Sequence, residues 1–282
     1  MNVADAMTPR ETVEVAELPG TRDDVLELLQ ERTFSSVPVV KTENGQETFR
    51  GLVSREDLIE RPDEDQLALL MRDVPTTTTD TSLAALAEMM AAEATRRVPV
   101  VDGELEGMIT ITDLIRAIAD GAVEAGATVE EVATRDVNTT YRAAPLPAAA
   151  NELYYANVPY SVILDEEGDM VGILTEVDII AVAEVVEGEA RTGDSIADQD
   201  DDWMWEGIKA VGNRYLPTRN VEIPDDPVDE YMSADLVTVG KTRSIQEAAR
   251  TMISDDIEQV PLVTGDELIG IVRDMDLLHA VK

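Results

Sequence analysis

Short apolar runs alternate along the chain with amphipathic segments of helical period, and one arrangement of the two occurs four times. Each copy has an apolar strand around a proline, a polar turn, and a second strand that opens with glycine. The prolines are Pro38, Pro99, Pro159 and Pro261, and the glycines are Gly51, Gly107, Gly172 and Gly270. The separations from proline to glycine are 13, 8, 13 and 9 residues. This predicts β-hairpins whose turns vary in length.

A helix is predicted before and after each hairpin. Thr21–Asp24 and Ser244–Glu247 are capping boxes that lead into apolar residues at helical spacing. The corresponding helix of the second copy opens at Thr81–Ser82, and that of the third runs from about Leu146 to Tyr155. An aspartate follows each glycine by six residues, at the start of the second helix. Each copy therefore reads strand, helix, strand, turn, strand, helix, which places the chain in the α/β (α+β) class.

The four copies divide the chain into repeats. Repeat 1 covers residues 1–61, repeat 2 residues 62–121, repeat 3 residues 122–187 and repeat 4 residues 228–282, with an insertion at 188–227. A unit this small buries its apolar sheet face poorly alone, so the repeats are expected to stack in pairs. Repeats 1 and 2 are predicted to form one module, and repeats 3 and 4 a second that carries the insertion.

The charge of the chain indicates the salt concentration to which the protein is adapted. The formal net charge is −37, and lysine occurs only at positions 41, 209, 241 and 282. The Debye length falls to about 3 Å at molar salt, so repulsion among carboxylates is screened there. Acidic residues spread along the whole chain are therefore typical of a halophilic protein. An acidic protein that neutralises a basic partner would carry its charge in blocks.

Several classes of function are disfavoured by what the sequence lacks. There is no cysteine and one histidine, His279, which is expected to pack on an apolar helix. A metal centre, a thiol nucleophile and a Ser-His-Asp triad are therefore not expected, and no phosphate loop of the Gly-x-x-x-x-Gly-Lys kind occurs. No secretory signal and no apolar run of membrane-spanning length is found. A cytoplasmic protein that is not an enzyme is expected.

The repeated residues resemble the cystathionine-β-synthase (CBS) domain. The resemblance is carried by the openings Met7-Thr8-Pro9 and Met232-Ser233, by the Val-Pro strands, and by the Gly-apolar-apolar-Thr/Ser-x-x-Asp endings. It implies four CBS repeats paired into two disc-shaped Bateman modules, as in haloarchaeal members of the family. It also implies clefts that bind adenosine-containing ligands, namely AMP, ADP, ATP or S-adenosylmethionine, with or without Mg²⁺, and no catalytic cofactor.

The resemblance implies a role for particular residues. The ribose hydroxyls would be bound by the aspartates Asp57, Asp113, Asp178 and Asp276. The phosphates would be met by Ser54, Arg55, Arg96, Arg97, Thr110, Thr175 and Arg273. The region around adenine would include Val37, Pro38, Thr78, Val98, Pro99, Val158, Pro159, Val260 and Pro261.

The chemistry of these residues agrees with the implied roles. A carboxylate has two acceptor oxygens for a cis-diol, and a helix N-terminus offers N–H donors to a phosphate. The same Ser/Thr-x-x-Asp pattern is also a capping box, and that alternative stays open. Arg273 replaces the capping hydroxyl in repeat 4, while Asn157 is found in repeat 3 where an arginine would help. Repeats 1 and 2 are therefore the stronger candidates for a phosphorylated ligand.

The insertion carries both tryptophans of the chain. Trp203 and Trp205 lie between an acidic run and a segment that holds Arg214 and Arg219. One interpretation is a helix whose tryptophans cover a sheet face. The other is a contact arm for a partner, because Trp and Arg dominate binding hot spots.

Two functions follow from the sequence. The first is a regulatory protein that senses adenosine ligands and signals through a protein partner or by self-assembly, for example as a homodimer. The second is an interaction protein that docks onto an enzyme, a transporter or a ribonucleoprotein such as the ribosome, with nucleotide as a structural element. General binding to nucleic acid is disfavoured by the charge.

Overall fold

The computed structural model describes residues 1–31, 36–54, 57, 64–182, 184–185, 208–211, 214–217 and 221–281. The chain divides into two compact units. Unit 1 consists of Met1–Ser54, Glu64–Asp136 and Val237–Lys282, and it holds the hairpins of repeats 1, 2 and 4. Unit 2 consists of Arg55–Asp63 and Val137–Leu236, and it holds the hairpin of repeat 3.

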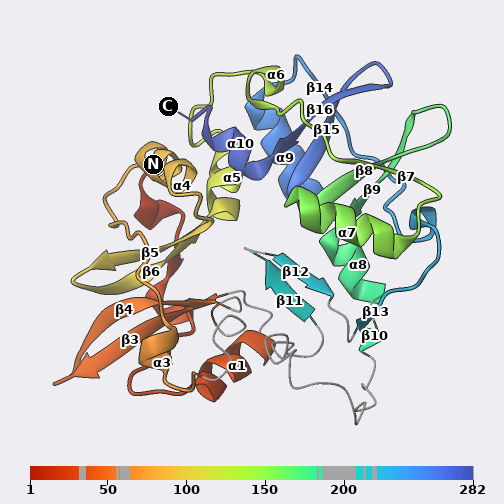
Figure 1. Cartoon of the computed structure of the whole chain (residues 1–282). Coiled ribbons are helices and arrows are strands. Elements are labelled where there is room, and N and C mark those ends of the chain that lie inside the picture. Colours follow the sequence, from red (N-terminus) through yellow and green to blue (C-terminus); the bar gives the residue numbers. More distant parts are fainter. Residues whose placement is uncertain are drawn as a thin grey trace, which may run out of the picture. The chain divides into compact units, whose positions relative to one another are not determined.

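Each repeat is built on a small sheet with an antiparallel hairpin (Figure 1). The hairpins are β3 (Ser36–Glu43) with β4 (Gln46–Ser54), β5 (Arg97–Asp102) with β6 (Glu104–Thr110), β8 (Tyr160–Leu164) with β9 (Met170–Thr175), and β15 (Gln259–Thr264) with β16 (Glu267–Arg273). Short parallel strands pair with three of them, namely β2 (Ala16–Glu17), β7 (Thr139–Tyr141) and β14 (Val239–Gly240). In repeat 2 a parallel bridge from Thr77 to Val100 takes this place. The α+β class predicted from the sequence is confirmed.

The longer helices lie where the sequence predicts them, all at capping signals except α7, which follows Pro145 without a side-chain cap. They are α1 (Arg22–Glu31), α4 (Leu83–Ala92), α5 (Ile111–Ala119), α7 (Leu146–Ala156), α8 (Glu176–Val182), α9 (Ile245–Asp255) and α10 (Asp274–Leu278). The Ser82 hydroxyl caps α4 by accepting from Ala85 N at 3.2 Å. Ser244 and Glu247 form a reciprocal capping box at the start of α9. His279 ends α10 as an exposed residue, so the expectation that it packs on an apolar face was wrong.

The residues that open each repeat pack on a different repeat. We call them opening segments: residues 1–12, 64–72, 123–134 and 226–233. They contain η1 (Val3–Asp5), β1 (Thr8–Pro9), η2 (Arg10–Thr12), α3 (Leu67–Leu70), α6 (Val129–Val132) and η3 (Val228–Glu230). The opening segment of repeat 1 lies on repeat 2, where Val3 N donates to Thr81 O at 2.9 Å and β1 pairs with β6. The opening segment of repeat 2 lies on repeat 1, where Leu52 and Arg72 exchange backbone hydrogen bonds.

Repeats 3 and 4 follow the same rule. The opening segment of repeat 3 lies on repeat 4 in unit 1, where Thr134 and Ile271 exchange backbone hydrogen bonds of 2.9 and 3.0 Å. The opening segment of repeat 4 lies on repeat 3 in unit 2, where Ser233 and Ile173 do the same at 2.9 and 3.1 Å. Val228 of this segment is fully buried against α7 and β9. Exchange of opening segments is therefore reciprocal within each consecutive pair of repeats.

The exchange explains the glycine at the start of each second strand. A Cβ on Gly270 would lie 2.7 Å from the Thr134 carbonyl oxygen, and one on Gly51 would lie 2.7 Å from the Arg72 carbonyl oxygen. The Thr8 carbonyl oxygen approaches Gly107 in the same way, whereas at Gly172 the nearest atoms belong to the flexible side chain of Met232. At Gly51, Gly107 and Gly270, no side chain larger than hydrogen fits under the opening segment without displacing its backbone.

The hairpin of repeat 3 has a different register from the one that its proline predicts. Gly172 lies opposite Ile163, as Gly107 lies opposite Val100 in repeat 2. Ser161 and Val162 therefore occupy the places of Val98 and Pro99. The strand β8 begins at Tyr160, so Val158 and Pro159 precede it. Aligning on the proline was misleading here because repeat 3 carries its proline before the strand.

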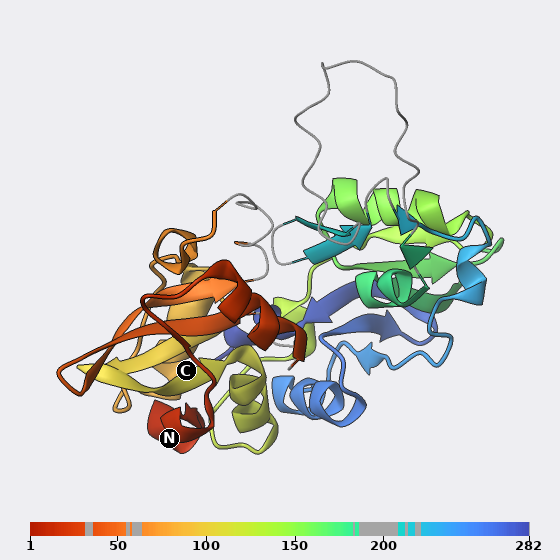
Figure 2. The same ribbon diagram turned by 90° about the horizontal axis from the view of Figure 1, so that it is seen from below.

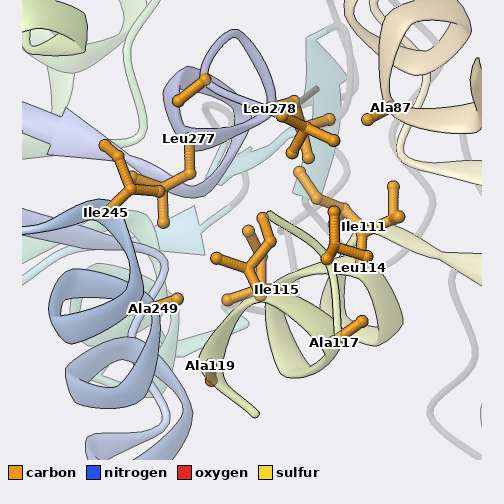
Figure 3. Close-up of a cluster of buried hydrophobic side chains, with 14 of the residues drawn as sticks. Ala87, Ile111, Leu114, Ile115, Ala117, Ala119, Ile245, Ala249, Leu277 and Leu278 are labelled. Carbon is orange, nitrogen blue, oxygen red and sulfur yellow. The ribbon is translucent and has the colours of Figure 1, made fainter. Parts of the chain in front are cut away.

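Repeats 2 and 4 share one hydrophobic core in unit 1. Figure 3 shows Ala87 of α4, Leu114 and Ile115 of α5, and side chains of α9 and α10 gathered in this cluster. Leu114 and Leu278 have relative exposures of 0% and 2%. A side chain of repeat 4 caps the C-terminus of α5, because Arg250 Nε donates to Ala119 O at 2.7 Å. This contact between helices fixes repeat 4 against repeat 2.

Repeats 1 and 2 meet in unit 1 through their sheets. Strand β4 contacts β6, and the β3–β4 and β5–β6 hairpins, orange and yellow, lie side by side in both views (Figure 1, Figure 2). This contact and the exchanged opening segments join the two repeats.

The described residues of the insertion include three strands. β13 (Val221–Glu222) pairs with β10 (Glu184–Val185) of repeat 3, and β11 (Ile208–Val211) pairs with β12 (Arg214–Pro217), both antiparallel. β12 contacts α8 of repeat 3. Trp203, Trp205 and Arg219 lie outside the described residues, and Arg214 is described only as a backbone position of β12.

Candidate functional site

The second helix of repeat 2 begins with a closed hydrogen-bonded pair. Thr110 ends β6, and its backbone N–H and its hydroxyl both donate to Asp113 Oδ2, at 2.8 Å each. The aspartate is thus the third residue of a capping box, as the alternative interpretation of the pattern predicts.

The same arrangement is found in repeats 3 and 4. Thr175 N and Thr175 Oγ1 donate to Asp178 Oδ2 at 2.8 and 2.7 Å. In repeat 4 the backbone N–H of Arg273 donates to Asp276 Oδ2 at 2.8 Å, and the guanidinium replaces the missing hydroxyl with bonds of 3.3 and 3.2 Å to the carboxylate. A cap with an arginine in place of threonine therefore closes by the same backbone bond.

Capping leaves part of each carboxylate for another partner. In repeats 2 and 3 both cap bonds go to Oδ2, so Oδ1 stays outside the box. Asp113 Oδ1 has a 3.3 Å contact with Arg116, and the Asp113 side chain is 15% exposed. Each carboxylate oxygen accepts two hydrogen bonds, so the box and a ligand hydroxyl can be served by one aspartate. The capping and ribose roles are compatible in this geometry.

The helix N-terminus beside each aspartate is an anion-binding environment. The first N–H groups of a helix have no partner within the helix and carry its positive dipole end. The threonine hydroxyls are less available than the sequence suggests, because Thr110 and Thr175 already donate their protons to Asp113 and Asp178. A phosphate here would have to rely on cations or backbone N–H groups.

The cation expected to meet phosphate in repeat 2 is held by repeat 4. Arg96 Nη1 and Nη2 donate to Asp274 Oδ1 and Oδ2 at 3.0 and 2.6 Å, and Nη2 lies 2.9 Å from Glu258 Oε1. The Arg96 side chain is 22% exposed and that of Asp274 is 8% exposed. Burial lowers the pKa of Arg96, but the two carboxylates raise it by more, so it lies above its usual value. Sequence analysis missed Asp274 and Glu258, because nothing in one repeat indicates which acids of another face it.

The valines predicted around adenine are core residues. Val37, Val98 and Val260 are fully buried, and the latter two belong to the core that repeats 2 and 4 share. The neighbouring prolines Pro38, Pro99 and Pro261 are buried as well, so the side chains that these three strands were expected to offer to adenine lie in the interior. Thr78 is exposed and bonds to Thr81 in a turn, whereas the adjacent Thr77 is buried and bridges to Val100.

Repeat 1 shows a different environment at the same position. Asp57 is 2% exposed, and Ser54 ends β4 opposite Ser36. The buried Ser36 hydroxyl has no hydrogen-bond partner within the described part of the chain. Arg55 lies outside the described residues. Arg97 of repeat 2 is half-buried in β5 opposite Thr110.

Among the described residues, no group of three or more His, Asp or Glu side chains is arranged to hold a metal ion. No helix within the described part of the chain is long and apolar enough to cross a membrane.

Comparisons with known proteins agree with the repeated geometry. The protein MJ1404 of Methanocaldococcus jannaschii, which is uncharacterized, is 27% identical over 91% of this chain, and the chain spans 56% of its length. A crystal structure of an uncharacterized conserved protein from Pyrococcus horikoshii is 27% identical, with a TM-score of 0.68 and 99% of both chains covered. The structure of MJ1225 from Methanocaldococcus jannaschii, proposed as an archaeal homologue of g-AMPK, shares the fold with a TM-score of 0.63 at 20% identity over 99% of both chains.

The family model for the CBS domain matches four separate stretches of the sequence. They are residues 3–64, 67–120, 129–184 and 228–282, and they coincide with the four repeats of the structure. This chain belongs to the CBS domain family and carries four CBS repeats.

Proposed function

We propose that this chain is a non-catalytic regulatory protein that binds adenosine-containing ligands beside α5, α8, α10 and Asp57, and that transmits the bound state to a protein partner. The single observation that carries the proposal is the geometry of the cap aspartates. In repeats 2 and 3, Asp113 and Asp178 close a capping box through Oδ2 and keep Oδ1 for a further hydrogen bond. In this proposal the ribose hydroxyls donate to Oδ1 of these two aspartates, and to the carboxylates of Asp57 and Asp276 in the other two repeats.

The pairing of repeats follows from the same proposal. Repeats 1 and 2, and repeats 3 and 4, form the two Bateman modules. The reciprocal exchange of opening segments within each consecutive pair supports this pairing. Adenine lies along the backbone of the hairpin strands next to Pro38, Pro99 and Pro261, and in repeat 3 next to Val162, because the register of β8 puts Val162 in the place of Pro99.

The ligand is tested by mass spectrometry of small molecules released from the purified, denatured chain. The chain carries a net charge of −37 and is taken to be halophilic and cytoplasmic, so purification and assays belong in molar KCl. An adenosine compound bound in stoichiometric amount supports the proposal. A chain that carries none, and that binds none of AMP, ADP, ATP or S-adenosylmethionine on titration, contradicts it.

The partner is tested by co-purification with and without ligand. A partner gained or lost as the ligand is added supports sensing. A partner retained regardless of ligand favours the second function, an interaction protein that docks onto a larger assembly with the ligand as a structural element. Changing Trp203 and Trp205 to alanine, with thermal melts beside the co-purification, then shows whether the insertion is a contact arm. Loss of the partner at an unchanged melting temperature is the expected result.

A further inference from the structure

A methionine side chain lies between the opening segment of repeat 4 and the strand on which this segment packs. The thioether of Met232 lies against Gly172 of β9, with Cγ and Cε 2.9 and 3.2 Å from the place of an added Cβ and the sulfur nearer still. The next residue, Ser233, exchanges backbone hydrogen bonds of 2.9 and 3.1 Å with Ile173. The thioether therefore fills the space beside the two bonds that join the segment to the strand.

The same side chain packs on the apolar core of repeat 3 without being enclosed by it. Met232 is half-buried against the cluster that includes Leu174 and Val228, which are themselves fully buried. Met90, in the core that repeats 2 and 4 share, is fully buried. A reagent in solution reaches a half-buried side chain more readily than an enclosed one. Met232 thus combines access from solvent with a packing role.

The other repeats do not place a thioether in this way. At their three motif glycines the closest atom of the opening segment is a backbone carbonyl oxygen. Met7 Sδ lies 3.3 Å from an added Cβ on Gly107, farther away than the carbonyl oxygen. In the segment that lies on repeat 4, Ala133 stands in the place of Met232. Among the described opening segments, the one on Gly172 alone makes its closest approach through a methionine sulfur.

We propose that Met232 is an oxidation site through which hydroperoxides release the opening segment of repeat 4 from repeat 3. A lone pair of the sulfur attacks one oxygen of hydrogen peroxide, so that the S–O bond forms and the O–O bond breaks. The departing hydroxide takes the proton of the transferred oxygen and leaves as water. The sulfur is oxidised to the sulfoxide, and the peroxide is reduced by the same pair of electrons.

The sulfoxide disfavours the packed segment in two ways. It adds an oxygen where the thioether already fills the space over Gly172, and it places a polar group against the apolar core of repeat 3. Movement of the segment away from β9 relieves both, and it breaks the backbone hydrogen bonds between Ser233 and Ile173. Enzymatic reduction of the sulfoxide restores the thioether, so the release is reversible.

The proposal is tested by amide hydrogen exchange on the full chain before and after treatment with hydrogen peroxide, with the sulfoxide at each methionine measured by peptide mass spectrometry. When Met232 is oxidised, exchange at Ile173 and Ser233 should quicken at least about tenfold, and methionine sulfoxide reductase should restore the original rates. The bonds between Thr134 and Ile271 are the internal control, because their opening segment contains no methionine. Exchange there should change by less than about twofold.

Met232→Leu separates this sulfur from those of the other methionines. Leucine keeps an apolar side chain of similar volume and has nothing to oxidise, so peroxide should change exchange at Ile173 and Ser233 by less than about twofold in this variant. Met1, which is 49% exposed, reports that the oxidant acted in both chains. Three results overturn the inference: Met232 stays reduced while Met1 is oxidised, exchange is unchanged although Met232 is a sulfoxide, or the variant responds to peroxide as the wild-type chain does. Each of them leaves the proposed function intact.

Discussion

Arg96 of repeat 2 and Asp274 of repeat 4 form a two-bond ion pair, although 178 residues separate them in the sequence. The pair lies at the edge of the core shared by α4, α5, α9 and α10. It links a residue expected to face a ligand with a residue that no motif singles out. The pair therefore ties repeat 2 to repeat 4 within unit 1.

Removing one member of the pair should destabilise the chain measurably. Asp274→Ala leaves a partly buried guanidinium with only Glu258, and we expect a loss of about 2–3 kcal/mol in the free energy of unfolding. A double-mutant cycle with Arg96→Ala should give a coupling energy of about 1–2 kcal/mol. The exposed pair of Arg135 and Glu130 is the control, and Glu130→Ala should cost less than about 1 kcal/mol. Equal losses in the free energy of unfolding at the two pairs would contradict a structural role for the pair of Arg96 and Asp274.

The opening segment of repeat 1 should stabilise repeat 2. Val3 is fully buried in the core around α4 and α5, so Val3→Ala should cost about 1–2.5 kcal/mol. Amide hydrogen exchange should quicken at β6 and at the start of α4, while β3 and β4 of repeat 1 change less. Val177 is 70% exposed, and Val177→Ala should change stability by less than about 0.5 kcal/mol. Loss of protection confined to β3 and β4 would show that the segments are not exchanged.

The glycine under an opening segment should tolerate no side chain. Gly270→Ala places a Cβ 2.7 Å from the Thr134 carbonyl oxygen and should destabilise by about 1–3 kcal/mol. Gly240 in β14 has no heavy atom within 4 Å of an added Cβ. Gly240→Ala should therefore be neutral or stabilising by up to about 1 kcal/mol. Chemical denaturation measures the free energy of unfolding of the two variants. If Gly240→Ala is the less stable of the two, close approach of the opening segment does not explain the glycine at position 270.

The cap of α9 should contribute a pH-dependent part of the stability. Hydrogen bonds from the Ser244 backbone N–H, from Arg243 and from the Ser244 hydroxyl lower the pKa of Glu247 from 4.5 to about 2. A carboxyl whose pKa is lowered by folding stabilises the native state above its unfolded pKa and loses this contribution as the pH falls through its folded pKa. Glu247→Gln should thus flatten the fall in stability between pH 4.5 and 2. Parallel pH profiles for the variant and the wild-type chain would show that the cap does not titrate in this range.

Much of each repeat could be predicted from local patterns. The capping signals at Ser82 and Ser244 place α4 and α9 correctly, and the spacing from Gly107 to Asp113 gives both β6 and the start of α5. These features depend on residues close together in the sequence. The register of repeat 3 was misassigned, because Pro159 resembles the strand prolines but precedes β8.

Contacts between repeats could not be predicted. The opening segments look like the first residues of their own repeats, and their places are shown by backbone hydrogen bonds of the structure, such as those between Thr134 and Ile271. Arg96 was expected to face a phosphate and instead bonds to Asp274. Its partner depends on how α10 packs against α5, which no periodicity within one repeat specifies. The role of Asp113 as a cap was foreseen as an alternative, and the geometry makes it compatible with ligand binding.

The central claim is that the cap aspartates bind the ligand, and a paired calorimetric titration tests it most directly. Thr128 and Glu131 form the same capping box at α6, with bonds of 3.0 and 2.9 Å, but without the motif. Glu131→Ala therefore removes a cap and no predicted ligand contact. At molar KCl we expect Asp113→Ala to lose one adenosine-binding site, and Glu131→Ala to keep the stoichiometry and affinity of the wild-type chain. Full binding by Asp113→Ala, or equal losses in both variants, would contradict the account.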